Sequence, residues 1–225
     1  MFVGHFGVGF GAKAIAPNAS LGSLFLAAQF IDLLWPAFLL IGLEQVRIVP
    51  GITRVTPLDF VHYPISHSLV AVIGWGVLFA AVYQVLRRYP RGAVVLGLAV
   101  VSHWFLDLVV HRPDLPLYPG SPDRYGFGLW GSVGATLAVE LPVFLAGLWL
   151  YLRATRASDA TGTWALWGLV AFLLAIYAAN LFGGEPPPSV TALAWVGQAQ
   201  WLLVAWGYWV DRHRRPAVGP LQAQP

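Results

Sequence analysis

The sequence contains no cysteine. Disulfide bonds and thiolate metal sites are therefore excluded, and cysteine usage gives no information about the compartment. Charge is also scarce, because Asp, Glu, Lys and Arg make up only 10% of the residues, whereas 58% are hydrophobic. Soluble globular domains contain about 25% charged residues, so this balance predicts a polytopic membrane protein. The net charge of only +3 gives no reason to expect a nucleic-acid partner.

Six apolar segments each come close to the ~20 residues that an α-helix needs to cross the hydrocarbon core. They lie at residues 20–43, 65–86, 92–110, 128–152, 163–183 and 190–210. Residues 2–15 are too few to span, but Gly7 and Gly11 at GxxxG spacing predict a half-helix packed closely against a neighbour. We therefore expect an all-α membrane protein with about six transmembrane helices plus an N-terminal half-helix.

Residues suited to chemistry are concentrated in the first part of the chain. Five of the six histidines lie before residue 112, and the acids inside the predicted spans end with Glu140. The last two spans contain neither an acid nor a histidine. We expect residues 1–153 to form a membrane-embedded metal-site domain, residues 154–215 a two-helix membrane scaffold, and residues 216–225 a disordered tail.

Lys and Arg fall unequally between the two sets of loops. The larger set is Lys13, Arg87, Arg88, Arg91, Arg153, Arg156, Arg212, Arg214 and Arg215. The smaller set is Arg47, Arg54, Arg112 and Arg124. The positive-inside rule then predicts a multi-pass protein with both termini in the cytoplasm. Membrane lipid is the expected partner, and the pattern leaves the oligomeric state open.

The stretch "SHWFLDLVVH" at 102–111 carries His103, Asp107 and His111 at intervals of four residues. On a helix these positions lie on nearly the same face, so they form a polar stripe on an otherwise apolar segment. Burying such groups is costly unless something pairs with them. The stripe therefore raises the question of what its partners are.

The rise of a helix places further polar groups at the depth of this stripe. With a hairpin that turns near Asn18, a rise of ~1.5 Å per residue puts His5 and Asp32 roughly 20 Å from the cytoplasmic end. The groups that converge on this layer are His5, Asp32, His67, His103, Asp107 and Glu140. The predicted spans offer no Lys or Arg to pair with them, so the carboxylates would be protonated or bind a cation. Imidazole and carboxylate without sulfur favour Zn²⁺ or another first-row metal.

These features resemble those of bacterial inner-membrane proteins of the LexA-binding, metal-dependent hydrolase type. The matching features are an N-terminal Gly-His, an acid in the first span, "HYPISHSL" (62–69) and "SHWFLDLVVHRPDLPLYPG" (102–120). The resemblance covers about residues 1–120 and implies a bacterial inner (cytoplasmic) membrane location with a metal site. Around Asp32 the chain has "FIDLLWP" where that family often has "PDID". The resemblance implies a site more directly than a reaction.

A more distant similarity concerns only the order of the polar residues. The order His, Asp, His and then H-x-x-x-D is similar to that of the metal ligands in zinc-dependent phospholipase C and P1 nuclease. In those enzymes one Asp bridges two metals, and a later His and Glu complete a further site. Mapped by order, His111 and Glu140 would be the later ligands here. This is an analogy between different folds.

We assign candidate roles on this basis. The predicted metal ligands are His5, Asp32, His67, His103, Asp107 and His111. The predicted catalytic groups are Asp107, Glu140 and His62, although His62 can equally be an ordinary loop residue. Arg112 and Arg124 are candidates for holding an anionic head group, with ordinary loop charges as the alternative. The expected cofactor is a divalent metal, Zn²⁺ first, as one or two ions.

The pattern predicts an integral-membrane, phospholipase-like hydrolase. It would cleave an ester or phosphodiester of an amphiphilic, lipid-like substrate with metal-activated water. One alternative is a proton- or metal-coupled permease that uses the same His/Asp cluster. The polar groups gather in one layer instead of lining a path, and the two halves show no inverted repeat. A second alternative is a non-catalytic membrane partner protein.

Overall fold

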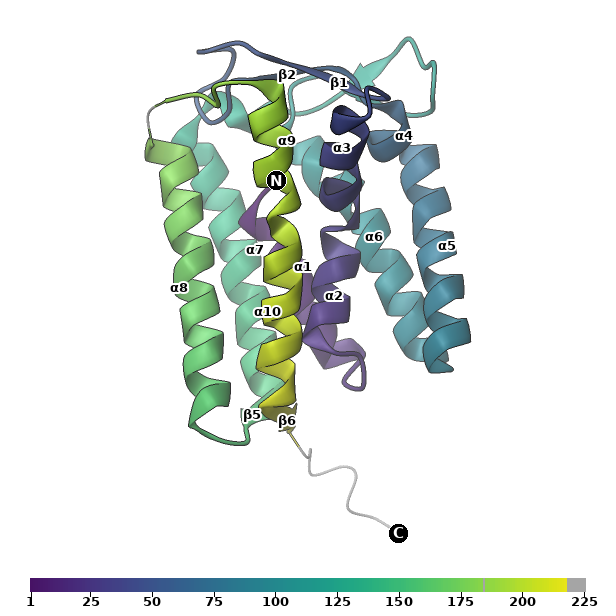
Figure 1. Ribbon diagram of the computed structural model, residues 1–225, viewed down its shortest axis with the longest axis vertical. Helices are drawn as coiled ribbons and strands as arrows, with labels where there is room; N and C mark the ends of the chain where they lie inside the picture. The colour runs from purple at the N-terminus through teal and green to yellow at the C-terminus, as the bar shows by residue number, and fades with distance from the viewer. Residues whose placement is uncertain (184, 218–225) are drawn as a thin grey trace.

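The structure is a computed structural model that describes residues 1–183 and 185–217. Its α-helices are α1 (Val3–Ile15), α2 (Leu21–Ala28), α3 (Phe30–Leu40), α4 (Pro64–His67), α5 (Leu69–Arg87), α6 (Pro90–Val110), α7 (Val133–Ala154), α8 (Ala160–Phe182), α9 (Val190–Gln198) and α10 (Gln200–Arg212). Its strands are β1 (Gln45–Ile48), β2 (Leu58–His62), β3 (Leu115–Pro116), β4 (Arg124–Tyr125), β5 (Thr155–Ala157) and β6 (Arg214–Pro216), and a 3₁₀-helix, η1, covers Leu129–Gly131. The helices form one bundle, and the strands lie at its two ends (Figure 1). The protein is therefore mostly helical, with short two-stranded sheets added.

The helices α5, α6, α7 and α8 are each long and apolar enough to cross a membrane. Helices α2 and α3 pass the same test only when they are taken together, and the angle between them is 56°. If this bent pair is counted as one span, it is the fifth. The predicted sixth span, 190–210, is divided at Ala199 into α9 and α10. Polar Gln198 and Gln200 flank this division and lower the local hydropathy. The prediction of six spans is thus not confirmed, since the described residues supply four or five candidates.

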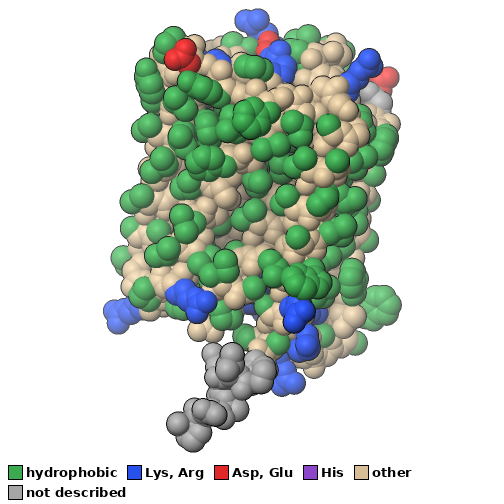
Figure 2. All heavy atoms as spheres, turned by 180° about the vertical axis from the view of Figure 1, so that it is seen from behind, with side chains coloured by type: hydrophobic (Ala, Val, Ile, Leu, Met, Phe, Trp, Pro, Cys, Tyr) green, Lys and Arg blue, Asp and Glu red, His purple; other side chains and the backbone are tan. Residues whose placement is uncertain are grey.

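The outer surface of the bundle is apolar around its middle. Figure 2 shows hydrophobic side chains over most of the rear face, with Lys and Arg gathered towards the two ends. Large apolar residues such as Val85, Trp164 and Leu202 are 75%, 75% and 70% exposed. Contiguous apolar surface of this kind marks an interaction with lipid or protein, and the apolar helices fit insertion into a membrane.

The predicted half-helix is α1, which lies inside the bundle against α7 (Figure 1). A Cβ atom on Gly7 would lie 2.7 Å from the carbonyl oxygen of Val143, so only glycine allows this approach. Gly11 faces Gly147 of α7, whose Cα would be 3.5 Å from a Cβ on Gly11. The predicted close packing of the GxxxG segment is therefore confirmed. It carries the start of the chain into the middle of the bundle, where Met1 is 5% exposed.

The first predicted span, 20–43, is broken in the middle. The Ser20 hydroxyl caps α2 by accepting a hydrogen bond from Ser23 N at 3.2 Å. The helix ends at Ala28, and α3 begins in a new direction at Phe30. The last carbonyls of a helix lack helical donors, so the break leaves Ala28 able to accept a side-chain hydrogen bond. It also puts Asp32 in the first turn of α3.

The two ends of the bundle carry different chain segments. The antiparallel pairs β1–β2 and β3–β4 lie at one end, and the pair β5–β6 lies at the other (Figure 1). Pro216 pairs with Thr155, and Ala217 N donates to Ala154 O at 2.8 Å. The predicted disorder of 216–225 is therefore wrong for Pro216, and residues 218–225 lie outside the described residues.

Candidate metal centre

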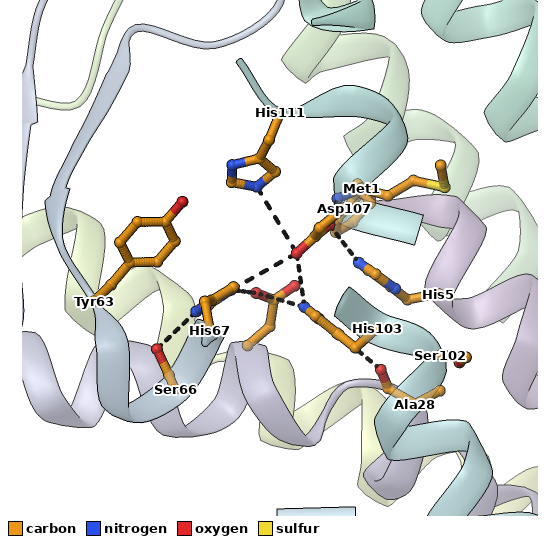
Figure 3. A network of polar contacts seen from close by, with 12 residues as sticks. Met1, His5, Ala28, Tyr63, Ser66, His67, Ser102, His103, Asp107 and His111 are labelled. Atoms are coloured by element: carbon orange, nitrogen blue, oxygen red, sulfur yellow. Dashed lines mark hydrogen bonds and ion pairs between the residues drawn. The ribbon is translucent and has the colours of Figure 1, made fainter. Parts of the chain in front are cut away.

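Helices far apart in the sequence bring histidines and aspartates to one place inside the bundle (Figure 3). His5 comes from α1, Asp32 from α3 and His67 from the end of α4, whereas His103 and Asp107 both come from α6. The four-residue spacing puts the last two side chains on one face of α6. The Nε2 atom of His103 accordingly lies 3.1 Å from Asp107 Oδ2. Residues predicted from their depth along the helices thus lie close together.

His67 occupies the last position of a one-turn helix. Pro64 begins α4, where its fixed φ suits the first helical turn. Ser68 then begins a new helix, because its hydroxyl accepts a hydrogen bond from Ala71 N at 3.3 Å. The chain therefore changes direction directly after His67, whose side chain is buried.

One oxygen of Asp107 is the common neighbour of three imidazoles. The distances from Asp107 Oδ2 to the Nε2 atoms of His103, His67 and His111 are 3.1, 3.7 and 3.8 Å. The other oxygen, Oδ1, lies 3.1 Å from His5 Nε2. Figure 3 shows the labelled histidines surrounding this carboxylate. Asp107 is therefore the centre of the cluster.

Asp32 forms the second carboxylate of the cluster. Its Oδ1 lies 3.5 Å from His103 Nε2 and 3.7 Å from His67 Nε2. The Asp32 side chain is 25% exposed, whereas that of Asp107 is 2% exposed. The rings of His5 and His103 stack in parallel with centroids 3.7 Å apart. Asp32 is thus the edge of the cluster that solvent or a substrate can reach.

The other ring nitrogen of His103 fixes its tautomer. His103 Nδ1 lies 3.1 Å from the carbonyl oxygen of Ala28, at the break between α2 and α3. A carbonyl only accepts, so Nδ1 must carry the hydrogen and the neutral ring has its lone pair at Nε2. That Nε2 is buried and has no hydrogen-bond partner among the described residues. The broken helix therefore aims a free lone pair at the two carboxylates.

His67 is held in the same way by a buried carboxylate that the sequence analysis did not identify. Glu44 accepts hydrogen bonds from Ser66 Oγ at 2.6 Å and from the backbone N atoms of Ile65 and Ser66, both at 2.8 Å. Because the single hydroxyl hydrogen of Ser66 goes to Glu44, Ser66 Oγ must accept from His67 Nδ1, 2.7 Å away. His67 therefore also presents a lone pair at Nε2.

His111 repeats the arrangement with a third acceptor. Its Nδ1 lies 2.9 Å from Asp114 Oδ1, which also accepts from the Tyr63 hydroxyl at 2.8 Å. Burial, together with the neighbouring Asp114 carboxylate, raises the pKa of the Tyr63 phenol well above its usual range, so the phenol stays a donor. Asp114 lies within the quoted "HRPDLP" segment, and its proximity to His111 in sequence was the available signal.

These contacts leave an electrostatic requirement at the centre. Three lone pairs face carboxylate oxygens, which is repulsive unless a cation lies between them, either a metal ion or an added proton. Ligand atoms at 2.0–2.1 Å from a tetrahedral Zn²⁺ lie about 3.3 Å apart. The distances between Nε2 and carboxylate oxygen here run from 3.1 to 3.8 Å. The donor types and their spacing therefore fit a first-row divalent metal.

The number of ions is limited by His103. Two sets of residues have ligand atoms within 4.8 Å of one another, namely His5–His103–Asp107 and Asp32–His67–His103. Both sets use His103, and one Nε2 lone pair binds one ion. A single ion is therefore the simplest fit, and a second ion would have to draw on His5 and Asp107 without His103.

Glu140 holds the beginning of α1. Its Oε2 accepts from Phe2 N at 2.8 Å and from Gly4 N at 3.4 Å, which are donors without partners inside the helix. The Met1 amino group donates to Asp107 Oδ1 beside it. These contacts fix the depth of His5. Glu140 lies next to the cluster but outside both sets of candidate ligands.

The structure does not bring the other predicted residues to the cluster. His62 is exposed on β2 and lines a separate, smaller cavity together with Arg124. Arg124 also donates to the carbonyl oxygen of Ser121. Arg112 is paired with Asp59 at 2.7 Å. None of these three predicted residues lines the cavity that adjoins the cluster.

That cavity has a volume of about 880 Å³. The cluster side of it is lined by Asp32, His67, Asp107, His111 and Glu140. Further lining comes from Met1 and Phe2, from Trp35 of α3, from β2 and the loop that precedes it, from η1, from the end of α8, from residues 185–188 and from α9. The cavity is therefore open to the cluster through Asp32 and Asp107, and it is large enough for a small amphiphile.

The comparisons with known proteins point to a family. Residues 2–185 match the model of the YdjM inner membrane protein family. Neither the curated proteins nor the solved structures contain a match to this chain. The match covers most of the chain, including every residue of the cluster and its positioning groups. The chain is a membrane protein that belongs to the YdjM inner membrane protein family.

Proposed function

We propose that this protein is a metal-dependent hydrolase that cleaves an ester or phosphodiester of an amphiphilic substrate. One observation carries the proposal. His67, His103 and His111 each direct Nδ1–H to an oxygen outside the cluster and Nε2 towards Asp107 Oδ2. Histidines that bind metals are oriented by such outer hydrogen bonds. A divalent ion bound there would lower the pKa of a water molecule and polarise the bond to be cleaved.

The residues of the chain have distinct roles in this proposal. His67, His103, Asp32 and Asp107 hold the ion, with Zn²⁺ the best match to their chemistry. Glu140 lines the same cavity, and its Oε1 has no hydrogen bond among the described residues, so we assign it the general base. His62 lies outside this cavity and has no part in the reaction.

The distribution of arginines supports one orientation of the site in this proposal. The end of the bundle that carries β5 and β6 also carries Arg153, Arg156, Arg214 and Arg215, and we assign it to the cytoplasm. The cavity lies towards the opposite end, beside the loop between β1 and β2. The reaction would then occur in the outer leaflet of the inner membrane.

Elemental analysis of the detergent-purified full chain tests the proposal. We expect about one Zn²⁺, Mn²⁺ or Fe²⁺ per chain, which is lost in both His103→Ala and Asp107→Ala. His213→Ala is the matched control, because His213 lies outside the cluster, next to Asp159. Hydrolysis of a chromogenic phosphodiester should stop on chelation and return when the metal is restored. Full-length protein that never binds a metal, although it is folded, would overturn the proposal.

A permease is the second candidate, and the broken helix favours it. Discontinuous membrane helices form the ion sites of many transporters, and here the break between α2 and α3 supplies both Asp32 and the Ala28 carbonyl. In that case an added proton, not a metal, would neutralise the cluster. Metal-free protein that takes up a proton at the cluster and acidifies vesicles would favour this function over hydrolysis.

A further inference from the structure

The lining of the large cavity is divided into a polar and an apolar part. The polar part is the cluster with Glu140 on one side and the loop between β1 and β2 on the other. The apolar part is formed by Tyr177, Leu181, Leu193 and Val196 of α8 and α9. A ligand that fills the cavity must therefore have a polar head and an apolar tail.

The apolar part reaches the outer surface of the bundle. Val196 lines the cavity and is nevertheless 71% exposed. Its neighbour Trp195 is 64% exposed on the same helix. This surface is the one that membrane lipid covers if α8 spans the bilayer. Val196 and Trp195 thus put exposed apolar surface of α9 beside the cavity, which is where a lipid tail would enter.

Arg54 is the Lys or Arg side chain that the described residues contribute to the cavity lining, which also includes the Met1 amino group on Asp107. Its side chain is exposed and forms no ion pair or hydrogen bond with the described residues, in contrast to the paired Arg112. Its backbone N donates to Trp130 O at 3.0 Å, and the Trp130 ring lies against His111 with centroids 4.3 Å apart. Arg54 is therefore tied to the loop that borders the cluster. A guanidinium so placed suits a phosphate or carboxylate group.

The charges of the cavity make anion binding depend on a metal. Its lining includes the carboxylates of Asp32, Asp107, Glu140 and Glu185 against the Arg54 guanidinium and the Met1 amino group, so negative charge remains in excess. Without a further cation, these carboxylates would repel a phosphate group. A divalent ion at the cluster would offset the charges of the Asp32 and Asp107 carboxylates and offer a phosphate oxygen a ligand position, with Arg54 as the positive side chain on the other side of the cavity.

We propose that this cavity binds a single phospholipid through its phosphate group, with phosphatidic acid as the simplest ligand of this class. The phosphate lies between the cluster and Arg54, and the acyl chains leave the cavity between α8 and α9. This inference rests on the proposed function, because it requires the ion. It adds a substrate class, a recognition residue that is neither Arg112 nor Arg124, and an entry route from the bilayer.

Native mass spectrometry of the full chain in detergent tests this inference. The probes are a phosphatidic acid, the matching diacylglycerol and soluble glycerol 3-phosphate, each added with and without Zn²⁺. We expect one phosphatidic acid per chain, bound at least about tenfold more tightly than either other probe and only with the metal. Arg54→Gln should weaken this binding about tenfold. Arg47→Gln, an exposed arginine of β1 that does not line the cavity, should leave it unchanged.

The entry route has its own pair of variants. Val196→Trp should weaken binding of the lipid but not of glycerol 3-phosphate, since only the lipid tail passes between α8 and α9. Leu202→Trp, on an exposed position of α10 outside the cavity lining, is the control.

Equal binding of glycerol 3-phosphate and phosphatidic acid would overturn the lipid assignment in favour of a soluble phosphate. The inference would be overturned if the metal-loaded protein bound phosphatidic acid no better than diacylglycerol, or if Arg54→Gln left the affinity for phosphatidic acid unchanged. Either result would leave the hydrolase proposal standing. Protein without metal would overturn both.

Discussion

Two buried charged sites in this protein differ in how their charges are balanced. At one, Lys13 of α1 donates to Asp211 at 2.7 Å and to the Ala19 carbonyl at 2.8 Å. The Lys13 side chain is 4% exposed, and its charge has an opposite charge beside it. At the other, Asp107 and Asp32 lie among imidazoles whose lone pairs point at them. The first site pairs one cation with one carboxylate, whereas the second has a single cation, the Met1 amino group, for two carboxylates.

This difference separates a structural contact from a binding site. A buried carboxylate is tolerated when a cation neutralises it. Asp211 receives that cation from α1, so the pair joins α1 to α10 and leaves nothing for a ligand to do. At the cluster the Met1 amino group faces Asp107 Oδ1. The described residues contribute no Lys or Arg side chain to Asp32 or to Asp107 Oδ2, so a second cation must come from outside or from added protons. Buried charge by itself does not identify a functional site, whereas buried charge without a partner does.

The largest effect should follow from removing the central carboxylate. Asp107 is close to four imidazoles and Asp32 to two, so we expect Asp107→Asn to bind no metal after desalting. Asp32→Asn should keep a metal with an affinity about 10–100-fold lower. Metal titration followed by elemental analysis compares the two variants. Loss of metal in Asp32→Asn with retention in Asp107→Asn would show that Asp107 is not the centre.

The next effect concerns the hydrogen bonds that orient the imidazoles from outside the cluster. In Glu44→Gln the new amide donates to Ser66 Oγ, so the Ser66 hydroxyl is free to donate to His67 Nδ1. That change moves the ring hydrogen to Nε2 and removes its lone pair from the cluster. We expect an affinity for Zn²⁺ about 10–100-fold lower with the protein still folded.

Nitrogen NMR of the imidazoles provides a readout that a purely structural role of Glu44 would not change. The His67 signals should report the tautomer with hydrogen at Nε2 in Glu44→Gln. Asp59→Asn, which removes the partner of Arg112, is the control and should keep the original tautomer and affinity. An unchanged His67 tautomer would contradict the assigned role of Glu44.

The sequence was sufficient to predict the residues at the centre because depth along a helix follows from residue number. A rise of ~1.5 Å per residue places His5, Asp32, His103 and Asp107 in one layer without knowledge of how the helices pack. The structure adds the directions of the side chains. The spacing of Gly7 and Gly11 likewise predicted close packing of α1 against a neighbour, because small residues let two helix backbones approach closely, and the structure shows that the neighbour is α7.

The outer hydrogen bonds could not be predicted in this way. Glu44 follows an apolar run and resembles an ordinary acid at the end of a span, because nothing local shows that the chain returns to place Ser66 beside it. The break at Gln29 has neither Pro nor Gly to mark it. Hydropathy measures the tendency to enter the membrane, so it also merged α2 with α3 and α9 with α10 into single predicted spans.

A third effect tests the paired site directly. Lys13→Met leaves Asp211 without its cation, and we expect a loss of roughly 3 kcal/mol in the free energy of unfolding, because breaking a buried pair exposes the remaining charge to an apolar surrounding. Metal content should stay at the wild-type value. Thermal unfolding in detergent with parallel elemental analysis measures both quantities. The double variant Lys13→Met/Asp211→Leu should regain much of the loss, and a fall in metal content in either variant would couple the two sites and contradict the comparison.

The smallest expected effect concerns an exposed ion pair, that of His213 with Asp159. The hydrogen bond from His213, at 2.8 Å, lowers the pKa of the Asp159 carboxyl below its usual value, and the N–H of Gly162 at 2.8 Å adds to this. Because the pKa of Asp159 is lower in the folded protein than in the unfolded chain, its ionised carboxylate stabilises the folded state. This contribution is fully present when the pH is above the unfolded pKa of about 3.9, and it is lost as the pH falls through the folded-state pKa. The wild-type advantage in unfolding temperature over Asp159→Asn should therefore be present at pH 7 and shrink at acid pH. A difference that stays constant with pH would show that Asp159 acts only as the cap of α8 and not through its charge.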